Sequence, residues 1–132
     1  MVNMSKKEIS SKSLHIIADF QGCKLENLKK AETGERILKE VISEAGMTAT
    51  GICSWQFEPE GYTAAVLLME SHATLHSWPE HAAVQIDIFS CGDPNKTKKA
   101  YTLLKEIFSP SDISEKFLKR SLNDIKDITS TE

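Results

Sequence analysis

Reactive side chains are concentrated in one short stretch of this chain, residues 70–93. The stretch contains a serine near its start, three histidines, a carboxylate at Glu80 and a thiol at Cys91. A serine beside a histidine is the ordinary arrangement for an activated hydroxyl nucleophile, and His76 follows Ser71 by five residues. The stretch therefore predicts nucleophilic or acid–base chemistry.

Two apolar runs flank these groups. Residues 64–69 and 82–89 are rich in aliphatic side chains and are bounded by polar, Pro and Gly positions, which is the pattern of buried strands. Groups at the ends of core strands are held more rigidly than groups on a free loop, as a catalytic site requires. Ser71 and His76 fall between the runs, where a turn would bring them together.

The apolar pattern of the whole chain predicts strands and helices in a mixed order. Strands are predicted over residues 13–20, 47–57, 62–70, 82–90 and 112–118. Helical spacing predicts one helix over residues 33–45, and another that begins at Pro94 after Asp93 as N-cap and ends near Phe108. Helices on one face of a mostly antiparallel sheet give a two-layer α+β sandwich.

The 132 residues are predicted to form a single domain with flexible ends at residues 1–12 and 124–132. Because the two main helices cover one face of the sheet, its other face must be covered by a partner or used by a ligand. We expect a homodimer that packs sheet to sheet.

Composition excludes several classes of partner. A net charge of −3 and a pI near 5.8 provide no basic footprint for nucleic acid or for a membrane surface. No apolar run reaches the roughly 18 residues of a membrane helix. Three cysteines without a C-x-x-C spacing indicate free thiols and a cytoplasmic location, with Cys23 and Cys53 as core thiols.

Three motifs in the reactive stretch carry a resemblance to a known family. They are Glu70-Ser71-His72, residues 76–80 (His-Ser-Trp-Pro-Glu) and residues 87–93 (Asp-Ile-Phe-Ser-Cys-Gly-Asp). Together they closely resemble the small prokaryotic S-adenosylmethionine decarboxylases, which are pyruvoyl enzymes of polyamine synthesis. Residues 18–23 and 57–63 are similar to the same family, so the resemblance covers nearly the whole chain.

The resemblance implies that the chain cuts itself before Ser71. The Ser71 hydroxyl would attack the Glu70 carbonyl and convert the amide to an ester, with the hydroxyl of Thr63 assisting. His76 would then remove the α-proton of Ser71, and elimination followed by hydrolysis would leave a pyruvoyl group in place of Ser71. The products would be a β chain of residues 1–70 and an α chain of residues 71–132.

The resemblance also implies the roles of the mature site. The pyruvoyl carbonyl would form a Schiff base with S-adenosylmethionine and act as the electron sink, so neither pyridoxal phosphate nor a metal is expected. Cys91 would return a proton to the α-carbon. Phe57 would stack on the adenine and Glu80 would hold the ribose hydroxyls. The product would be the aminopropyl donor for spermidine synthesis.

Three alternative functions remain open from the sequence. A pyruvoyl enzyme could decarboxylate another amino acid, such as arginine or ornithine, although an aromatic at Phe57 would then have no adenine to stack on. A non-catalytic homologue that never cleaves is the second alternative. The third is a zinc site built from His72, His76, His81 and Cys91.

Overall fold

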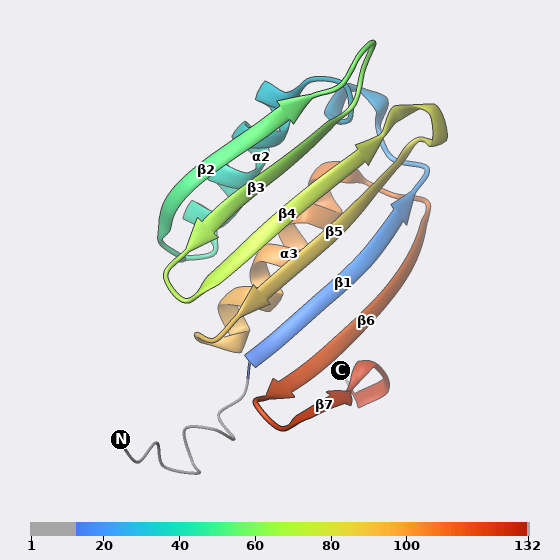
Figure 1. Cartoon of the computed structure of the whole chain (residues 1–132). Coiled ribbons are helices and arrows are strands. Elements are labelled where there is room, and N and C mark those ends of the chain that lie inside the picture. The colour runs from blue at the N-terminus through green and yellow to red at the C-terminus, as the bar shows by residue number, and fades with distance from the viewer. Residues whose placement is uncertain (1–12, 132) are drawn as a thin grey trace.

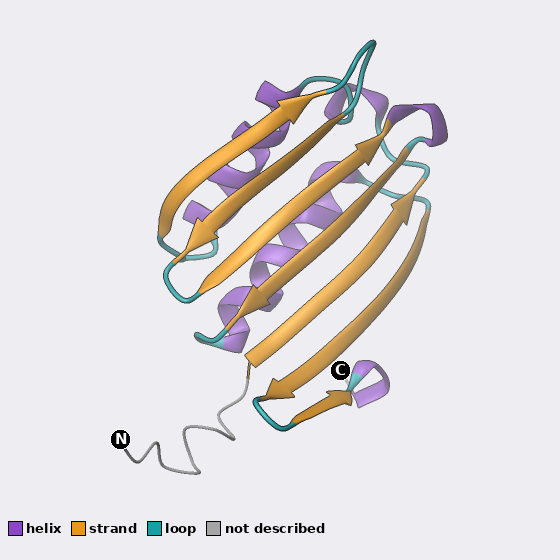
Figure 2. Ribbon diagram, in the orientation of Figure 1, coloured by secondary structure: helices purple, strands orange, loops and turns teal. Residues whose placement is uncertain are grey.

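The computed structural model describes residues 13–131, which form a seven-stranded antiparallel sheet with two long helices on one face (Figures 1 and 2). The strand order is β2-β3-β4-β5-β1-β6-β7. The strands are β1 (Ser13–Gln21), β2 (Ala49–Gln56), β3 (Tyr62–Leu68), β4 (Ser71–Trp78), β5 (Ala83–Ser90), β6 (Asp112–Ser121) and β7 (Asp124–Asp127). The long helices are α2 (Ala31–Glu44) and α3 (Pro94–Phe108), and short 3₁₀ turns span Leu25–Asn27, Pro79–His81 and Thr129–Thr131. The predicted two-layer α+β sandwich is confirmed.

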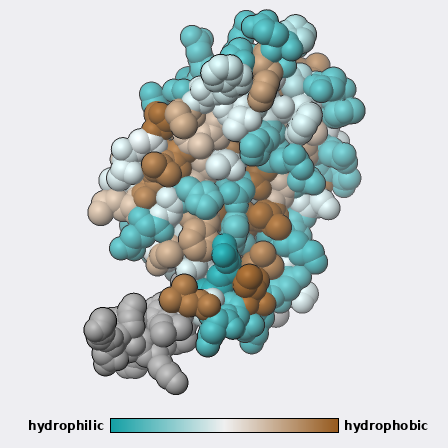
Figure 3. Space-filling model, in the orientation of Figure 1, coloured by the Kyte–Doolittle hydropathy of each residue, from teal (hydrophilic) through white to brown (hydrophobic). Residues whose placement is uncertain are grey.

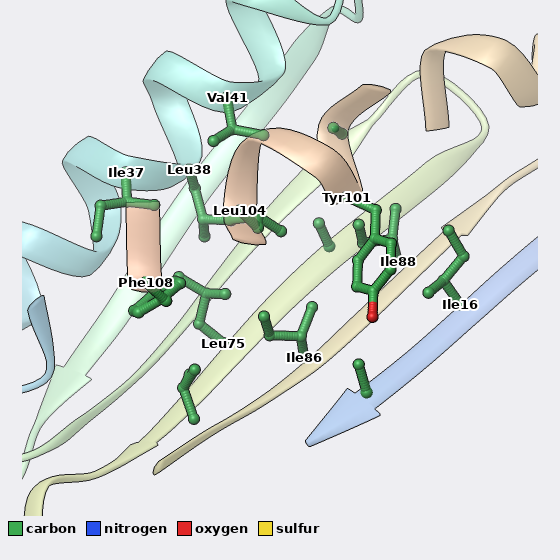
Figure 4. Packing of buried hydrophobic residues seen from close by; sticks show 14 of the residues in the cluster. Ile16, Ile37, Leu38, Val41, Leu75, Ile86, Ile88, Tyr101, Leu104 and Phe108 are labelled. Atoms are coloured by element: carbon green, nitrogen blue, oxygen red, sulfur yellow. The ribbon is translucent and has the colours of Figure 1, made fainter. Parts of the chain in front are cut away.

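The core lies between the sheet and the two helices (Figure 4). Ile16, Leu75 and Ile88 from three central strands are fully buried there, together with Leu38 and Leu104 from the helices. Each such side chain stabilises the fold by roughly 1.5–3 kcal/mol relative to an exposed one. Because side chains alternate along a strand, the residues between these point to the face that carries no helix. We call that face of the sheet the open face.

Local features fix where the helices lie. Asp93 caps α3 by accepting a hydrogen bond from the backbone N–H of Asn95 at 2.9 Å, and Pro94 is the first helical residue, as predicted. In α2, a Cβ added at Gly34 would lie 2.2 Å from the ring of Tyr62 on β3. A glycine at this position therefore allows α2 to pack closely on the sheet.

Strand β4 is absent from the sequence prediction. Its helix-facing residues include the small Ala73 and the polar Ser77 around a single large apolar residue, Leu75. Its other face carries polar side chains such as Thr74 and His76. Buried and exposed side chains therefore alternate along β4, but few of the buried ones are large and apolar. Backbone hydrogen bonds to β3 and β5 on both sides stabilise this strand, which the hydrophobic pattern alone does not indicate.

Residues 124–131, which the sequence analysis assigned to a flexible end, form strand β7 and a 3₁₀ turn, while residues 1–12 and Glu132 lie outside the described residues. Strand β7 pairs with β6, and its side chains are all exposed. Polar contacts stabilise it, including an ion pair between Lys116 and Asp127 at 3.0 Å and a hydrogen bond from the Phe117 N–H to the Thr129 hydroxyl at 2.9 Å. An apolar pattern could not reveal such a strand.

The two predicted core thiols have different surroundings. Cys23 is buried, and burial raises the pKa of its thiol to about 11. Cys53 is exposed on the open face of β2, so its prediction as a core thiol is wrong. Within residues 13–131, no helix has both the length and the apolar composition to cross a membrane. The cytoplasmic location stays a prediction.

Candidate active site

At one end of the sheet the chain turns from β3 into β4. Glu70 lies in this turn with a left-handed backbone, φ 67°, and Ser71 is the first residue of β4, opposite Ser90 at the end of β5. The backbone N–H of Cys91 donates to the Glu70 carbonyl oxygen, with an N···O distance of 3.4 Å. We call Glu70, Ser71, Ser90 and Cys91 the serine end; here the predicted cleavage site lies beside the predicted proton donor.

At the other end of the sheet lie the remaining predicted site residues. The Thr63 hydroxyl and His76 Nδ1 are 3.1 Å apart across β3 and β4. Both line a cavity of about 710 Å³ that is also lined by Phe57 and Glu80, which is within the size range of small-molecule sites. We call Phe57, Thr63, His76 and Glu80 the histidine end. In Figure 1 it lies at the upper end of the sheet, and the serine end lies at the lower end.

The structure does not bring Ser71 and His76 together within one chain. Both lie on the continuous strand β4, and at about 3.3 Å per residue the five-residue step spans roughly 17 Å. The register agrees, because Ser71 pairs with Leu68 of β3 whereas His76 pairs with Thr63. The turn that the sequence analysis placed between these two residues is therefore wrong.

The open face connects the two ends and carries both apolar and polar side chains (Figure 3). Trp55, Leu67 and Trp78 point to this face and are 69%, 61% and 44% exposed. Large apolar side chains gathered on one face of a sheet are typical of a surface that another layer covers. The open face is therefore a candidate interface, as the sequence analysis expected.

A network of charged and imidazole groups also lies on the open face. The Asp87 carboxylate accepts hydrogen bonds from His15 Nε2 and, at 2.9 Å, from His72 Nε2. The Arg120 guanidinium donates to His15 Nδ1 at 2.9 Å and stacks over the ring of Phe89. Burial acts to raise the pKa of the Asp87 carboxyl, but the hydrogen bonds and electrostatic interactions of His15 and His72 outweigh burial and hold that pKa below its usual value.

The same network bears on the zinc alternative. Within residues 13–131, the only group of possible metal ligands close enough together is His15, His72 and Asp87. Arginine can only donate, so the bond from Arg120 makes His15 Nδ1 the acceptor and leaves the proton on His15 Nε2. While Nε2 carries that proton, its lone pair is not available to a metal. The four residues proposed from the sequence do not form such a group.

Sequence reasoning missed three polar residues near these sites. Ser90 precedes Cys91 directly and contacts Ser71, so its position next to a candidate proton donor was an available signal. His15 is a lone imidazole in an apolar strand, and Arg120 is one of 16 lysine and arginine residues in the sequence. Only the strand register shows that His15 and Arg120 meet.

Known proteins resemble this chain in sequence. A family model described as S-adenosylmethionine decarboxylase matches residues 14–121. An S-adenosylmethionine decarboxylase proenzyme from Archaeoglobus fulgidus is 42% identical over 106 residues, which cover 80% of this chain and 95% of that protein. A proenzyme of the same description from Thermosipho melanesiensis is 40% identical over 93 residues, covering 70% of this chain and 72% of the relative.

Two solved structures share the fold. The crystal structure of the adenosylmethionine decarboxylase from Aquifex aeolicus superposes with a TM-score of 0.81 at 30% identity and covers 85% of this chain and 92% of that one. A Trypanosoma brucei AdoMetDC-delta26 monomer superposes with a TM-score of 0.60 over 80% of this chain and 45% of that one, and at 17% identity it shows the fold alone. The chain thus belongs to the S-adenosylmethionine decarboxylase family of carboxy-lyases, as its motifs indicated.

Proposed function

We propose that this protein decarboxylates S-adenosylmethionine with a pyruvoyl group that it makes from its own Ser71. The observation that carries the proposal is the turn between β3 and β4, where the bond from Glu70 to Ser71 lies against Cys91. The family of the chain supports the substrate. The product is the aminopropyl donor for spermidine synthesis.

The turn favours cleavage in two ways. A left-handed backbone at a non-glycine residue costs about 1–2 kcal/mol, and cutting the bond after Glu70 releases that strain. The N–H of Cys91 points at the Glu70 carbonyl oxygen, on which negative charge develops when the Ser71 hydroxyl attacks. The backbone at Glu70 is therefore strained, and its carbonyl group is polarised, before the reaction begins.

The second step of processing needs a base, and the base lies at the histidine end. His76 accepts or donates a hydrogen bond with the Thr63 hydroxyl, so the imidazole is oriented, but it is far from Ser71 of its own chain. The second subunit removes this difficulty. A two-fold axis that runs between two facing sheets and across their strands places the serine end of one subunit on the histidine end of the other.

Such a homodimer also explains the open face. Its exposed apolar side chains, among them Trp55 and Leu67, become buried between the two sheets. Each complete site then takes Ser71 and Cys91 from one subunit and uses the partner subunit's Thr63 and His76. Two such sites form, one at each end of the interface.

In the mature enzyme, side chains from both the serine end and the histidine end take part in the decarboxylation. The pyruvoyl carbonyl supplies the electron sink for the carbanion that remains when carbon dioxide leaves. The Cys91 thiol, exposed beside the new chain end, gives the α-carbon its proton. The Phe57 ring offers a flat apolar surface for adenine and a favourable face for the sulfonium cation. The Glu80 carboxylate accepts hydrogen bonds from the ribose hydroxyls.

Two measurements on the purified protein test the proposal. An intact-mass spectrum under denaturing conditions should show two chains, residues 1–70 and residues 71–132 with a pyruvoyl start, and carboxyl-labelled S-adenosylmethionine should release labelled carbon dioxide. Ser71→Ala is the control for both. Release from arginine or ornithine alone would indicate a different substrate. A single mass for all 132 residues would indicate a non-catalytic homologue.

A further inference from the structure

We propose that Ser90 is a positioning residue for self-cleavage, whose hydroxyl holds the Ser71 hydroxyl in place for attack on the Glu70 carbonyl carbon. This inference deepens the proposed function and rests on it. It concerns the first step only, the conversion of the amide to the ester.

The position of Ser90 suits this role. It is the last residue of β5, it pairs with Ser71 of β4, and it is only 2% exposed. The Ser71 hydroxyl donates to Ser90 Oγ at 3.0 Å. The backbone N–H of Gly92 donates to the same oxygen, also at 3.0 Å. A hydroxyl oxygen has two acceptor positions, so both are in use and the Ser90 side chain is fixed from two directions.

Residues 90–92 hold both reacting groups at once. Ser90 Oγ holds the nucleophile, the Ser71 hydroxyl, while the N–H of Cys91 holds the carbonyl oxygen of Glu70 at 3.4 Å. The other contact of the Ser71 hydroxyl, with the Met69 carbonyl oxygen, is longer at 3.4 Å. Without Ser90 the hydroxyl would be free to leave this rotamer, and a loss of alignment of about 1 Å can cost about 100-fold in rate.

The chemical step balances without any change in Ser90. A bond forms between Ser71 Oγ and the Glu70 carbonyl carbon, the bond from that carbon to the Ser71 nitrogen breaks, and the Oγ proton ends on the nitrogen. Because the Ser71 hydroxyl gives its hydrogen to the bond with Ser90, its oxygen lone pairs stay available for the attack. Ser90 keeps its own proton, and His76 acts only afterwards.

The test compares the cleavage rates of Ser90 variants with the cleavage rate of a control variant that loses a different buried hydroxyl. Ser90→Ala removes the acceptor, Ser90→Cys replaces it with a weak one of similar size, and Ser90→Thr keeps it. Thr97→Val is the control, because Thr97 is fully buried in the first turn of α3 and its hydroxyl donates to the Asp93 carbonyl oxygen. Cleavage is followed by intact mass over time, and melting temperatures are measured for every variant.

We expect Ser90→Ala and Ser90→Cys to cleave about 10- to 100-fold more slowly than the unaltered chain. Ser90→Thr should stay within about threefold, and Thr97→Val should cleave at the unaltered rate even if its melting temperature falls. A folded Ala or Cys variant that cleaves at the unaltered rate would overturn the role of Ser90. So would a slowing no greater than that of Thr97→Val.

Hydroxylamine, which cuts esters, identifies the affected step. It should release fragments from His76→Ala, which stops after the ester forms, but should not accelerate Ser90→Ala, which stops before it. Rapid cutting of Ser90→Ala by hydroxylamine would place Ser90 after the ester and contradict the inference. If the unaltered chain itself never cleaves, with or without hydroxylamine, the proposed function fails first, so the two failures are distinguishable.

Discussion

The two ends of the sheet differ in the chemistry they hold. The serine end holds the left-handed residue Glu70, the proposed nucleophile Ser71 and a thiol in a tight turn, but the proposed base for the Ser71 α-proton, His76, lies elsewhere. The histidine end holds an oriented imidazole and a cavity of about 710 Å³, but no scissile bond. Each end lacks what the other supplies. This difference is the basis of our proposal that a single subunit supplies half of each of two sites.

The largest effect is expected from Ser71→Ala, which should abolish the function of the serine end and leave ligand binding at the histidine end intact. Cleavage should be abolished because the nucleophile is gone, whereas adenosine should still bind, since Phe57 and Glu80 are untouched. Intact mass and equilibrium dialysis measure the two properties. Ser43→Ala, an exposed serine on α2, is the control and should cleave normally. Fragments from the Ser71 variant would show that the cleavage site is misassigned.

Cys91→Ala should distinguish the two proposed roles of the serine end, self-cleavage and protonation of the substrate α-carbon. Processing depends on the Cys91 backbone N–H, which alanine keeps, so cleavage should proceed within a few-fold of the normal rate. Decarboxylation should fall by about 10²- to 10⁴-fold, because the proton donor is lost. Carbon dioxide release from the processed variant checks this. Unchanged turnover would remove Cys91 from the mechanism.

Phe57→Ala should affect substrate binding and spare processing. Loss of a stacking ring that is already 47% exposed should raise KM by about tenfold, which corresponds to roughly 1.4 kcal/mol. The rate of self-cleavage should not change. Steady-state kinetics on the processed enzyme, compared with the cleavage time course, separate the two quantities. Equal losses in both would show that the ring acts by supporting the fold.

The smallest effect concerns the network between the ends. The pKa of Asp87 is held below its usual value in the folded chain, so its stabilising contribution is full above about pH 4 and is lost as the pH falls through the folded pKa. Asp87→Asn should therefore lower the free energy of unfolding by about 1–2 kcal/mol at pH 7. The difference between the two proteins should shrink below pH 4. Urea denaturation across pH 3–7 measures it, and a constant difference would contradict the assignment.

The helix-facing side of the sheet was predictable from the sequence, and the open face was not. Buried apolar residues such as Ile16 and Ile88 recur at every second position, so burial against the helices defines the strands β1 and β5. Strand β4 combines small buried residues with polar exposed ones, and its hydrogen bonds to two neighbours stabilise it instead. A pattern of apolar residues records burial and does not record backbone pairing.

The candidate site shows the same limit. The motif around Ser71, His76 and Cys91 identified the family and supplied the candidate site residues, whose roles stay predictions. Sequence proximity, however, suggested that Ser71 and His76 meet within the chain, whereas an extended strand carries them roughly 17 Å apart. Ser90 was missed because serine has many structural uses, and only the β4–β5 register shows its contact with Ser71.

The most direct test of the shared site mixes two inactive chains. When the Ser71→Ala and His76→Ala chains are co-expressed, each mixed dimer has two different sites. One site lacks both the Ser71 hydroxyl and the His76 imidazole. The other site has both, with Ser71 from the His76→Ala subunit and His76 from the Ser71→Ala subunit. We expect each variant alone to stay uncut and, with random pairing, about half of the His76→Ala chains to be cut after co-expression. Cut Ser71→Ala chains are not expected. If the unaltered chain cleaves but the co-expressed His76→Ala chain, distinguished by a tag, stays whole, the two ends do not form one site across the dimer.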